Sequence, residues 1–152
     1  MKKAFTMIEL VFVIVILGIL SAVAFPKLSG VLKDANYASA LATISSLRTA
    51  ITNERQNNLI KGSAAYPQLL DDAGTGVHEQ LFDGNGTIHI LQYPIYSKNK
   101  MGGWMKTTDN SGTTIGYKYY INDATTVDFN YTKATGVFDC NHALANCKAI
   151  SE

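Results

Sequence analysis

An uncharged apolar run near the start of the chain limits what this sequence can fold into. The run covers Leu10–Phe25, 16 positions without a charged residue. As an α-helix it is about 24 Å long, shorter than the roughly 30 Å hydrocarbon core of a membrane. Extending the helix back to Phe5 gives about 31 Å, enough to cross a membrane, but the extended helix then contains Glu9. A carboxylate at the edge of a membrane helix is costly, so Glu9 is a candidate functional residue that needs a partner.

Charge and hydropathy leave two interpretations of this segment open. Lys2 and Lys3 precede the run, and the positive-inside rule keeps such a basic start in the cytoplasm and sends the rest of the chain outward. In the first interpretation the run is a secretory signal that is removed after Ala22-Val23-Ala24, leaving a mature chain that starts at Phe25. In the second it is a membrane helix that is kept. The acidic Glu9 and a helical periodicity that continues past the cleavage position favour the second.

The residues around Glu9 stand in a specific order. They read Ala4-Phe5-Thr6-Met7-Ile8-Glu9-Leu10, followed by an apolar stretch with a Gly and a Pro. Over residues 2–30 the segment resembles the N-terminus of type IV pilins and type II secretion pseudopilins. The resemblance implies that a prepilin peptidase cuts between Ala4 and Phe5, that Phe5 is then N-methylated, and that the apolar helix is retained. The family usually has Gly before the cut, so Ala4 is a departure that predicts slower cleavage.

The resemblance also implies a role for Glu9 in filament assembly. Cleavage creates an α-amino group on Phe5, which is largely cationic at neutral pH. When helices pack side by side, the Phe5 amine of one subunit meets Glu9 of a neighbour, and the opposite charge favours the ionised carboxylate in a dry environment. The implied partners are other pilin-like subunits in homo- or hetero-oligomers, prepilin peptidase, an assembly platform and a motor ATPase. The implied location is the bacterial inner membrane, with the N-terminus cytoplasmic and the head periplasmic, and later a pilus or pseudopilus filament.

Helical periodicity continues beyond Pro26. Apolar residues recur at steps of three and four, which predicts one face of a helix. They are Leu28, Val31, Leu32, Ala35, Ala38, Leu41, Ile44, Leu47 and Ile51. Asn and Gly stop signals predict that the helix ends within Asn57–Gly62. Pro26 removes an internal hydrogen bond and Gly18 has a low helix propensity, so we expect a bend or a locally melted stretch between them.

The rest of the chain predicts a small head. A short helix is expected at Gln68–Ala73, and β-branched or alternating apolar runs predict four strands. These strands are Thr87–Tyr93, Gly116–Asn122, Thr126–Lys133 and Val137–Cys140, with a long polar excursion at Ser97–Thr114. The predicted fold class is α+β, a long N-terminal helix, transmembrane and then amphipathic, packed on a small antiparallel sheet as in pilins. The predicted layout is a leader at 1–4, a transmembrane and assembly helix at 5–26, an amphipathic helical half at 27–61 and a head at 62–152.

Two cysteines, Cys140 and Cys147, lie near the end of the sequence. Outside the cytoplasm two cysteines normally pair, which predicts a disulfide. A short C-terminal disulfide loop also resembles the one that holds the last segment of many type IV pilins. The competing interpretation is a zinc site, because Asp139 and His142 add two further ligand types. The spacing matches no standard zinc signature, so the disulfide is favoured.

Composition and motifs favour a structural protein. The formal net charge is +1, which is not the basic footprint of a nucleic-acid-binding domain. We find no phosphate loop, nucleophile elbow or paired-carboxylate site and expect neither enzymatic activity nor a cofactor; Asp109–Gly112 lacks the spacing of a calcium loop. We predict a structural subunit of a type IV pilus or type II secretion pseudopilus that serves protein secretion or DNA uptake. The alternatives are a minor tip pilin that binds DNA or a secreted substrate and, less favoured, an ordinary secreted protein.

Overall fold

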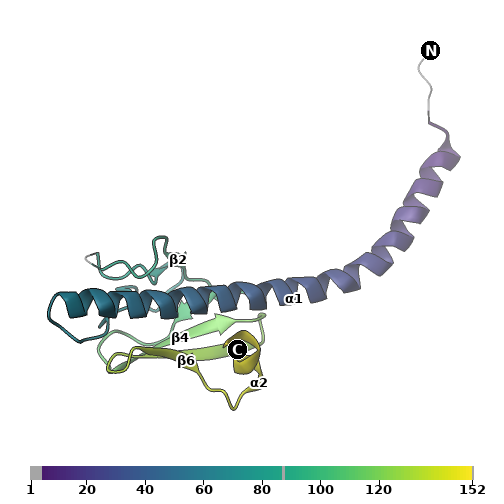
Figure 1. Cartoon of the computed structure of the whole chain (residues 1–152). Helices are drawn as coiled ribbons and strands as arrows, with labels where there is room; N and C mark the ends of the chain where they lie inside the picture. Colours follow the sequence, from purple (N-terminus) through teal and green to yellow (C-terminus); the bar gives the residue numbers. More distant parts are fainter. Residues whose placement is uncertain (1–4, 87, 152) are drawn as a thin grey trace. The chain divides into compact units, whose positions relative to one another are not determined.

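The computed structural model describes residues 5–86 and 88–151. The chain divides into two compact units, Met1–Ala35 and Asn36–Glu152. Helix α1 (Met7–Ile60) contributes residues to both units. It is uninterrupted through Gly18 and Pro26, and Figure 1 draws α1 as one continuous coiled ribbon. The locally melted stretch that we considered between these two residues is therefore not observed, and the bend stays a prediction.

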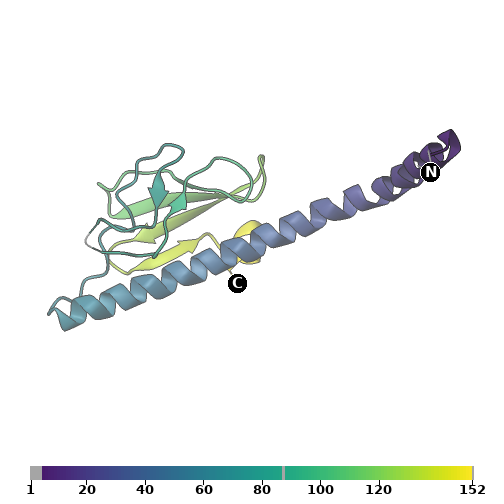
Figure 2. The ribbon, with the colours of Figure 1, turned by 90° about the horizontal axis from the view of Figure 1, so that it is seen from above.

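The second unit adds six strands and a short helix to the C-terminal part of α1. They are β1 (Gln80–Leu81), β2 (Ile95–Tyr96), β3 (Trp104–Lys106), β4 (Thr114–Tyr120), β5 (Thr126–Thr132), β6 (Val137–Cys140) and α2 (Ala145–Ser151). Strands β1 and β2 form a small antiparallel pair. The other four form one antiparallel sheet in the order β3-β4-β5-β6; Figure 2 shows green and yellow arrows of this sheet side by side. The predicted α+β fold class is confirmed.

The four-stranded sheet has one apolar face. In β5, Val127, Phe129 and Tyr131 are buried, whereas the alternating residues Asp128 and Asn130 are exposed. Side chains in a strand point to opposite faces in turn, so this alternation marks a sheet with one face in the core. Phe129 is paired with Tyr117 of β4 and with Cys140 of β6, which fixes the register at the centre of the sheet.

The core joins α1 to this sheet. Ala40, Ile44, Leu47 and Ile51 are buried at steps of three and four, which gives α1 one apolar stripe within the head. This stripe is narrower than predicted, because Ala38 and Leu41 are exposed. Against it lies a cluster of aromatic rings with centroids 4.8–6.1 Å apart, within the range of favourable ring pairs. These rings are Phe82, Trp104, Tyr117, Tyr119, Phe129 and Phe138.

Two local predictions are wrong. The expected helix at Gln68–Ala73 does not form, because this backbone makes tertiary contacts instead: the Leu70 carbonyl accepts from the Gly84 N–H at 2.9 Å. The expected first strand at Thr87–Tyr93 is absent from its described residues 88–93, and β2 begins later, at Ile95. The preceding turn contains two glycines with positive φ, Gly84 at 88° and Gly86 at 74°.

Four elements were not predicted, namely strands β1, β2 and β3 and helix α2. Strand β3 lies inside the polar excursion Ser97–Thr114, where three residues are too few for a periodic signal. Helix α2 has seven residues and begins after a turn in which Ala143 N–H donates to the Asn141 side chain at 3.0 Å. The other predicted strands are present as β4, β5 and β6, with bounds shifted by no more than two residues in β4 and β5.

Candidate functional site

The N-terminal part of α1 presents a continuous apolar surface. Each large apolar side chain from Phe5 to Phe25 is between 49% and 87% exposed in the isolated chain. Among the described residues, one helix is long and apolar enough to cross a membrane, and that helix is α1. An exposed apolar surface of this extent marks a membrane or protein contact. Because Leu10–Phe25 contains no charged residue, the whole circumference of the helix is available for that contact.

Glu9 lies at the start of this surface and is held by Thr6. Its Oε2 accepts hydrogen bonds from the Thr6 N–H and from the Thr6 hydroxyl, both at 2.9 Å. The Glu9 N–H donates back to the Thr6 Oγ1 at 3.4 Å. Thr6 and Glu9 thus form a reciprocal capping box, which satisfies backbone donors that the first turn of a helix leaves unpaired. The Thr-x-x-Glu spacing is the sequence signature of this capping box.

Phe5 precedes the capping box and is 85% exposed. Its amino group is the expected product of processing, and Ala4 on the other side of the cut lies outside the described residues. In the isolated chain Glu9 is engaged with Thr6, and its pairing with a Phe5 amine stays a prediction about neighbouring subunits. A carboxylate has two oxygens and about four acceptor sites, so the capping box leaves room for a cation.

The two cysteines are joined as expected. A disulfide links Cys140 at the end of β6 to Cys147 in α2, with Cα atoms 5.8 Å apart. Next to it, Asp139 accepts from Arg48 of α1 at 2.9 Å and contacts the His142 ring at 3.0 Å. Arg48 also donates to the Phe138 carbonyl at 3.1 Å and to the Ser151 carbonyl at 3.4 Å. The C-terminal loop is therefore tied to the long helix by a side chain as well as closed by a covalent bond.

The disulfide changes the chemistry of the alternative zinc site. Ligand atoms of Asp139, Cys140 and Cys147 lie within 4.8 Å of one another. Zinc binds cysteine as a thiolate, and both sulfurs are bonded to each other here. The described geometry therefore supports the disulfide rather than a zinc site.

We expect the native protein to contain no free thiol. Thiol labelling under denaturing, non-reducing conditions should modify neither Cys140 nor Cys147, because both are in the disulfide. Closing an eight-residue loop predicts that reduction lowers the free energy of unfolding by roughly 2–3 kcal/mol. Two labelled thiols together with one bound zinc per chain would contradict this prediction.

A buried ion pair lies in the head, between residues that no sequence motif marks. Lys106 Nζ is 2.6 Å from Asp71 Oδ1, and both side chains are fully buried. Lys106 also donates to the Ala73 carbonyl at 2.8 Å, while Asp71 Oδ2 accepts from the Phe82 N–H at 3.1 Å and from the Tyr117 hydroxyl at 2.8 Å. Burial raises the pKa of Tyr117, and the negative charge of Asp71 raises it further, so the phenol stays a donor. The network is satisfied by donors and acceptors from four segments, which indicates a structural role.

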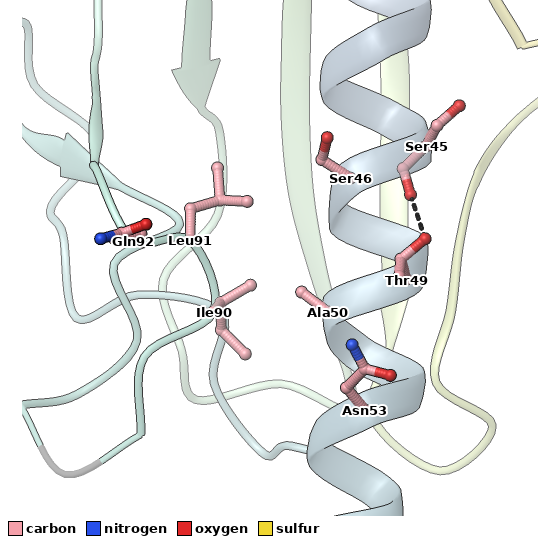
Figure 3. Close-up of a pocket in the computed structure, with 8 residues that line it drawn as sticks. All are labelled: Ser45, Ser46, Thr49, Ala50, Asn53, Ile90, Leu91 and Gln92. Atoms are coloured by element: carbon pink, nitrogen blue, oxygen red, sulfur yellow. Dashed lines mark hydrogen bonds between the residues drawn. The ribbon is translucent and has the colours of Figure 1, made fainter.

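A groove runs between α1 and the segment 90–92, shown in Figure 3. It has a volume of about 410 Å³ and is lined by short polar or apolar side chains, namely Ser45, Ser46, Thr49, Ala50, Asn53, Ile90, Leu91 and Gln92. The Thr49 hydroxyl is already bonded to the Ser45 carbonyl at 2.8 Å. A second cavity of about 350 Å³ adjoins it through Ser46, Leu91 and Gln92. The lining residues include no acid, base or thiol, so they do not form an acid–base or nucleophilic constellation.

The segment Asp109–Gly112 is a hydrogen-bonded turn. Asp109 Oδ1 accepts from the Ser111 hydroxyl at 2.5 Å and from the Ser111 N–H at 3.1 Å. These bonds lower the pKa of the Asp109 carboxyl, the hydroxyl bond most. The Asn110 carbonyl accepts from Lys133 at 2.6 Å. Protein donors thus use oxygens that a calcium ion would need.

Comparison with known proteins points to one family. Residues 1–25 match the family described as the prokaryotic N-terminal methylation motif. The chain is also 41% identical over 56 residues to a fimbrial protein of Moraxella nonliquefaciens. That match covers 37% of this chain and 36% of the relative, so it spans about a third of each protein. The methylation motif, the fimbrial relative and the long apolar helix followed by small antiparallel sheets support the assignment of this chain to the type IV pilin family.

Proposed function

We propose that the protein is a structural subunit of a type IV pilus or type II secretion pseudopilus, polymerised through its N-terminal helix. The observation that carries this proposal is the exposed apolar surface of α1 from Phe5 to Phe25, with Glu9 near its N-terminal end. Such a surface needs a bilayer or neighbouring apolar helices around it. The methylation motif at residues 1–25 and the fimbrial relative support the second environment as the final one.

The same proposal gives an order of events. Lys2 and Lys3 keep the leader, residues 1–4, on the cytoplasmic side while the head is exported. Helix residues 5–26 hold the precursor in the inner membrane, prepilin peptidase removes the leader, and Phe5 is methylated. The subunit then leaves the bilayer for a filament core in which its helix packs against other pilin-like subunits. The resemblance to the pilin family implies that an assembly platform and a motor ATPase drive this step.

We expect the mature chain to begin with N-methylated Phe5. The Ala4–Phe5 junction lies before Thr6 and Glu9 and after the basic start, on the side where the leader stays. Intact-mass measurement and N-terminal peptide analysis of native protein check this result. A mature chain that starts at Phe25 would instead show an ordinary cleaved signal and reject the proposed function.

Ala4→Gly is the companion variant, because it restores the residue that the family usually has before the cut. It should speed conversion of precursor to mature chain, measured by pulse-chase on a gel that separates the two forms. Ala4→Val, which adds two methyl groups at the cut, should slow conversion and serves as the matched control.

A further inference from the structure

An amine and a carboxyl group are held in contact in the interior of the head. Lys106 Nζ lies 2.6 Å from Asp71 Oδ1, and neither side chain has any exposed surface. We propose that these two residues condense to an amide between Lys106 Nζ and Asp71 Cγ, a covalent cross-link between β3 and the segment before β1. The ion pair in the structure is the state that precedes this bond. The inference needs only a folded head and is independent of the proposed function.

Burial favours the condensation in two ways. Contact between the amine and the carboxyl group replaces a bimolecular encounter with a step inside one molecule, which greatly raises their effective concentration. Two charges are also costly to keep in a dry site, and the amide replaces them with one uncharged group. The pair formed by Lys118 and Asp128 lacks both features, because its charged atoms are 3.6 Å apart and its side chains are 33% and 73% exposed.

Two donors lie where negative charge develops during the attack. Asp71 Oδ2, the oxygen that Lys106 does not contact, accepts from the Phe82 N–H at 3.1 Å and from the Tyr117 hydroxyl at 2.8 Å. Attack on Asp71 Cγ turns this oxygen into an oxyanion, and donors that are already in place stabilise such a charge. Burial raises the pKa of Tyr117, so its hydroxyl keeps the proton that it donates.

The backbone that supplies one of these donors is strained. Phe82 has a φ of 63°, a left-handed value that is unusual for a bulky side chain. Tertiary contacts hold this backbone in place, since the next N–H but one, that of Gly84, donates to the Leu70 carbonyl at 2.9 Å. Strained conformations of this kind gather at functional sites, where the surrounding structure imposes them. Here the strained residue directs its N–H at the Asp71 carboxylate.

The condensation balances without a co-reactant. One proton passes from the Lys106 ammonium to Asp71 Oδ1, and the lone pair of the resulting amine attacks Cγ. A C–N bond forms, Nζ gives a second proton to Oδ1, and the bond between Cγ and Oδ1 breaks as water leaves with its electron pair. Oδ2 becomes the amide oxygen and keeps its two donors. The N–H that remains on Nζ has an acceptor in the Ala73 carbonyl, which Nζ already contacts at 2.8 Å.

The test is mass spectrometry of the native, mature protein after reduction, alkylation and digestion with trypsin. Trypsin does not cut after a lysine whose amine is in an amide. Asp71 lies in the tryptic peptide 62–98, and Lys106 is the boundary between peptides 101–106 and 107–118. We therefore expect a branched species that joins 62–98 to 101–118 and is one water lighter than the sum of the two peptides.

The same digest contains a control. Lys118, in its exposed pair with Asp128, should be cut normally, because that pair should stay unlinked. Lys106→Met should abolish the branched species and restore the missing water to the intact mass. Losing Lys106 destabilises the head whether the pair is ionic or covalent, so the mass tests the inference and the free energy of unfolding does not.

A second experiment tests the donors. Tyr117→Phe removes one of the two hydrogen bonds to Oδ2, and loss of such a donor slows a reaction roughly 10²–10³-fold. In a pulse-chase experiment the branched peptide should appear more slowly by about that factor. Tyr119→Phe is the matched control. It removes a hydroxyl on the same strand that donates to the Asn36 carbonyl at 2.8 Å, and it should leave the rate unchanged.

Linear peptides of full mass at 62–98 and 101–106 in the mature protein would overturn the inference. A link that forms equally fast in Tyr117→Phe and in the unaltered chain would reject the role given to the Tyr117 hydroxyl.

Discussion

Glu9→Val is expected to leave membrane insertion intact and to remove the subunit from filaments. Insertion becomes easier, because no carboxylate has to be placed near hydrocarbon. In the filament the same change leaves the Phe5 amine of a neighbour unpaired in a dry core. Removing one partner of a buried pair costs about 3–5 kcal/mol, and every added subunit bears that cost. The measurement compares the subunit content of sheared filaments with the membrane-bound pool.

Three controls separate charge from helix capping. Glu9→Gln keeps the shape and an acceptor for Thr6 but loses the charge, so its assembly defect should be milder than that of Glu9→Val. Thr6→Val removes the hydroxyl that bonds Glu9 at 2.9 Å, and loss of a cap costs about 1 kcal/mol. Thr6→Ser retains the hydroxyl and should assemble normally. Normal filament incorporation of Glu9→Val would reject the pairing mechanism.

Lys106→Met is expected to destabilise the head by about 3–5 kcal/mol, because it leaves the Asp71 carboxylate buried without its cation. Asp71→Leu should lower the free energy of unfolding by a comparable amount. It leaves the Lys106 ammonium buried without its anion and removes the acceptor for the Phe82 N–H and the Tyr117 hydroxyl. Denaturant unfolding of detergent-solubilised full-length chain, followed by fluorescence of Trp104 in the adjacent aromatic cluster, gives the free energy of unfolding.

The matched control is Lys118→Met. Lys118 pairs with Asp128 at 3.6 Å, but these side chains are 33% and 73% exposed, so the cost should stay below about 1 kcal/mol. The double variant Asp71→Leu/Lys106→Met removes both charges and should be less destabilised than the two single effects added together. Equal effects for Lys106→Met and Lys118→Met would show that the burial of the Asp71–Lys106 pair contributes nothing.

The sequence predicted those parts of the fold that rest on local periodicity. The apolar run from Leu10 and the three- and four-residue steps through Ile51 predicted one long helix, and the alternation at Thr126–Lys133 predicted β5. The disulfide between Cys140 and Cys147 was predictable, because two cysteines allow a single pairing. The helix and the strand were predictable from residues close together in sequence, and the disulfide from the small number of possible pairings.

The unpredicted parts depend on residues far apart in the chain. Asp71 and Lys106 are separated by 35 positions, and neither stands in a pattern that marks a buried charge. Strand β3 owes its existence to pairing with β4, where Trp104 lies opposite Tyr119. The segment Gln68–Ala73 has helical composition, but its Asp71 side chain bonds to Phe82, which follows β1, and to Lys106 of β3. Tertiary contacts therefore override local propensity here.

A cationic side chain lies at each of the two outer strands of the four-stranded sheet, Arg48 at β6 and Lys106 at β3. On β6, the Phe138 carbonyl accepts a hydrogen bond from the Arg48 guanidinium of α1 at 3.1 Å. On β3, Lys106 turns a charge inward. Free strand edges invite pairing with other chains, and inward charges or occupied edge groups oppose it. In the filament proposed above, where helix packing brings many copies together, we expect these two contacts to oppose pairing of the heads edge to edge.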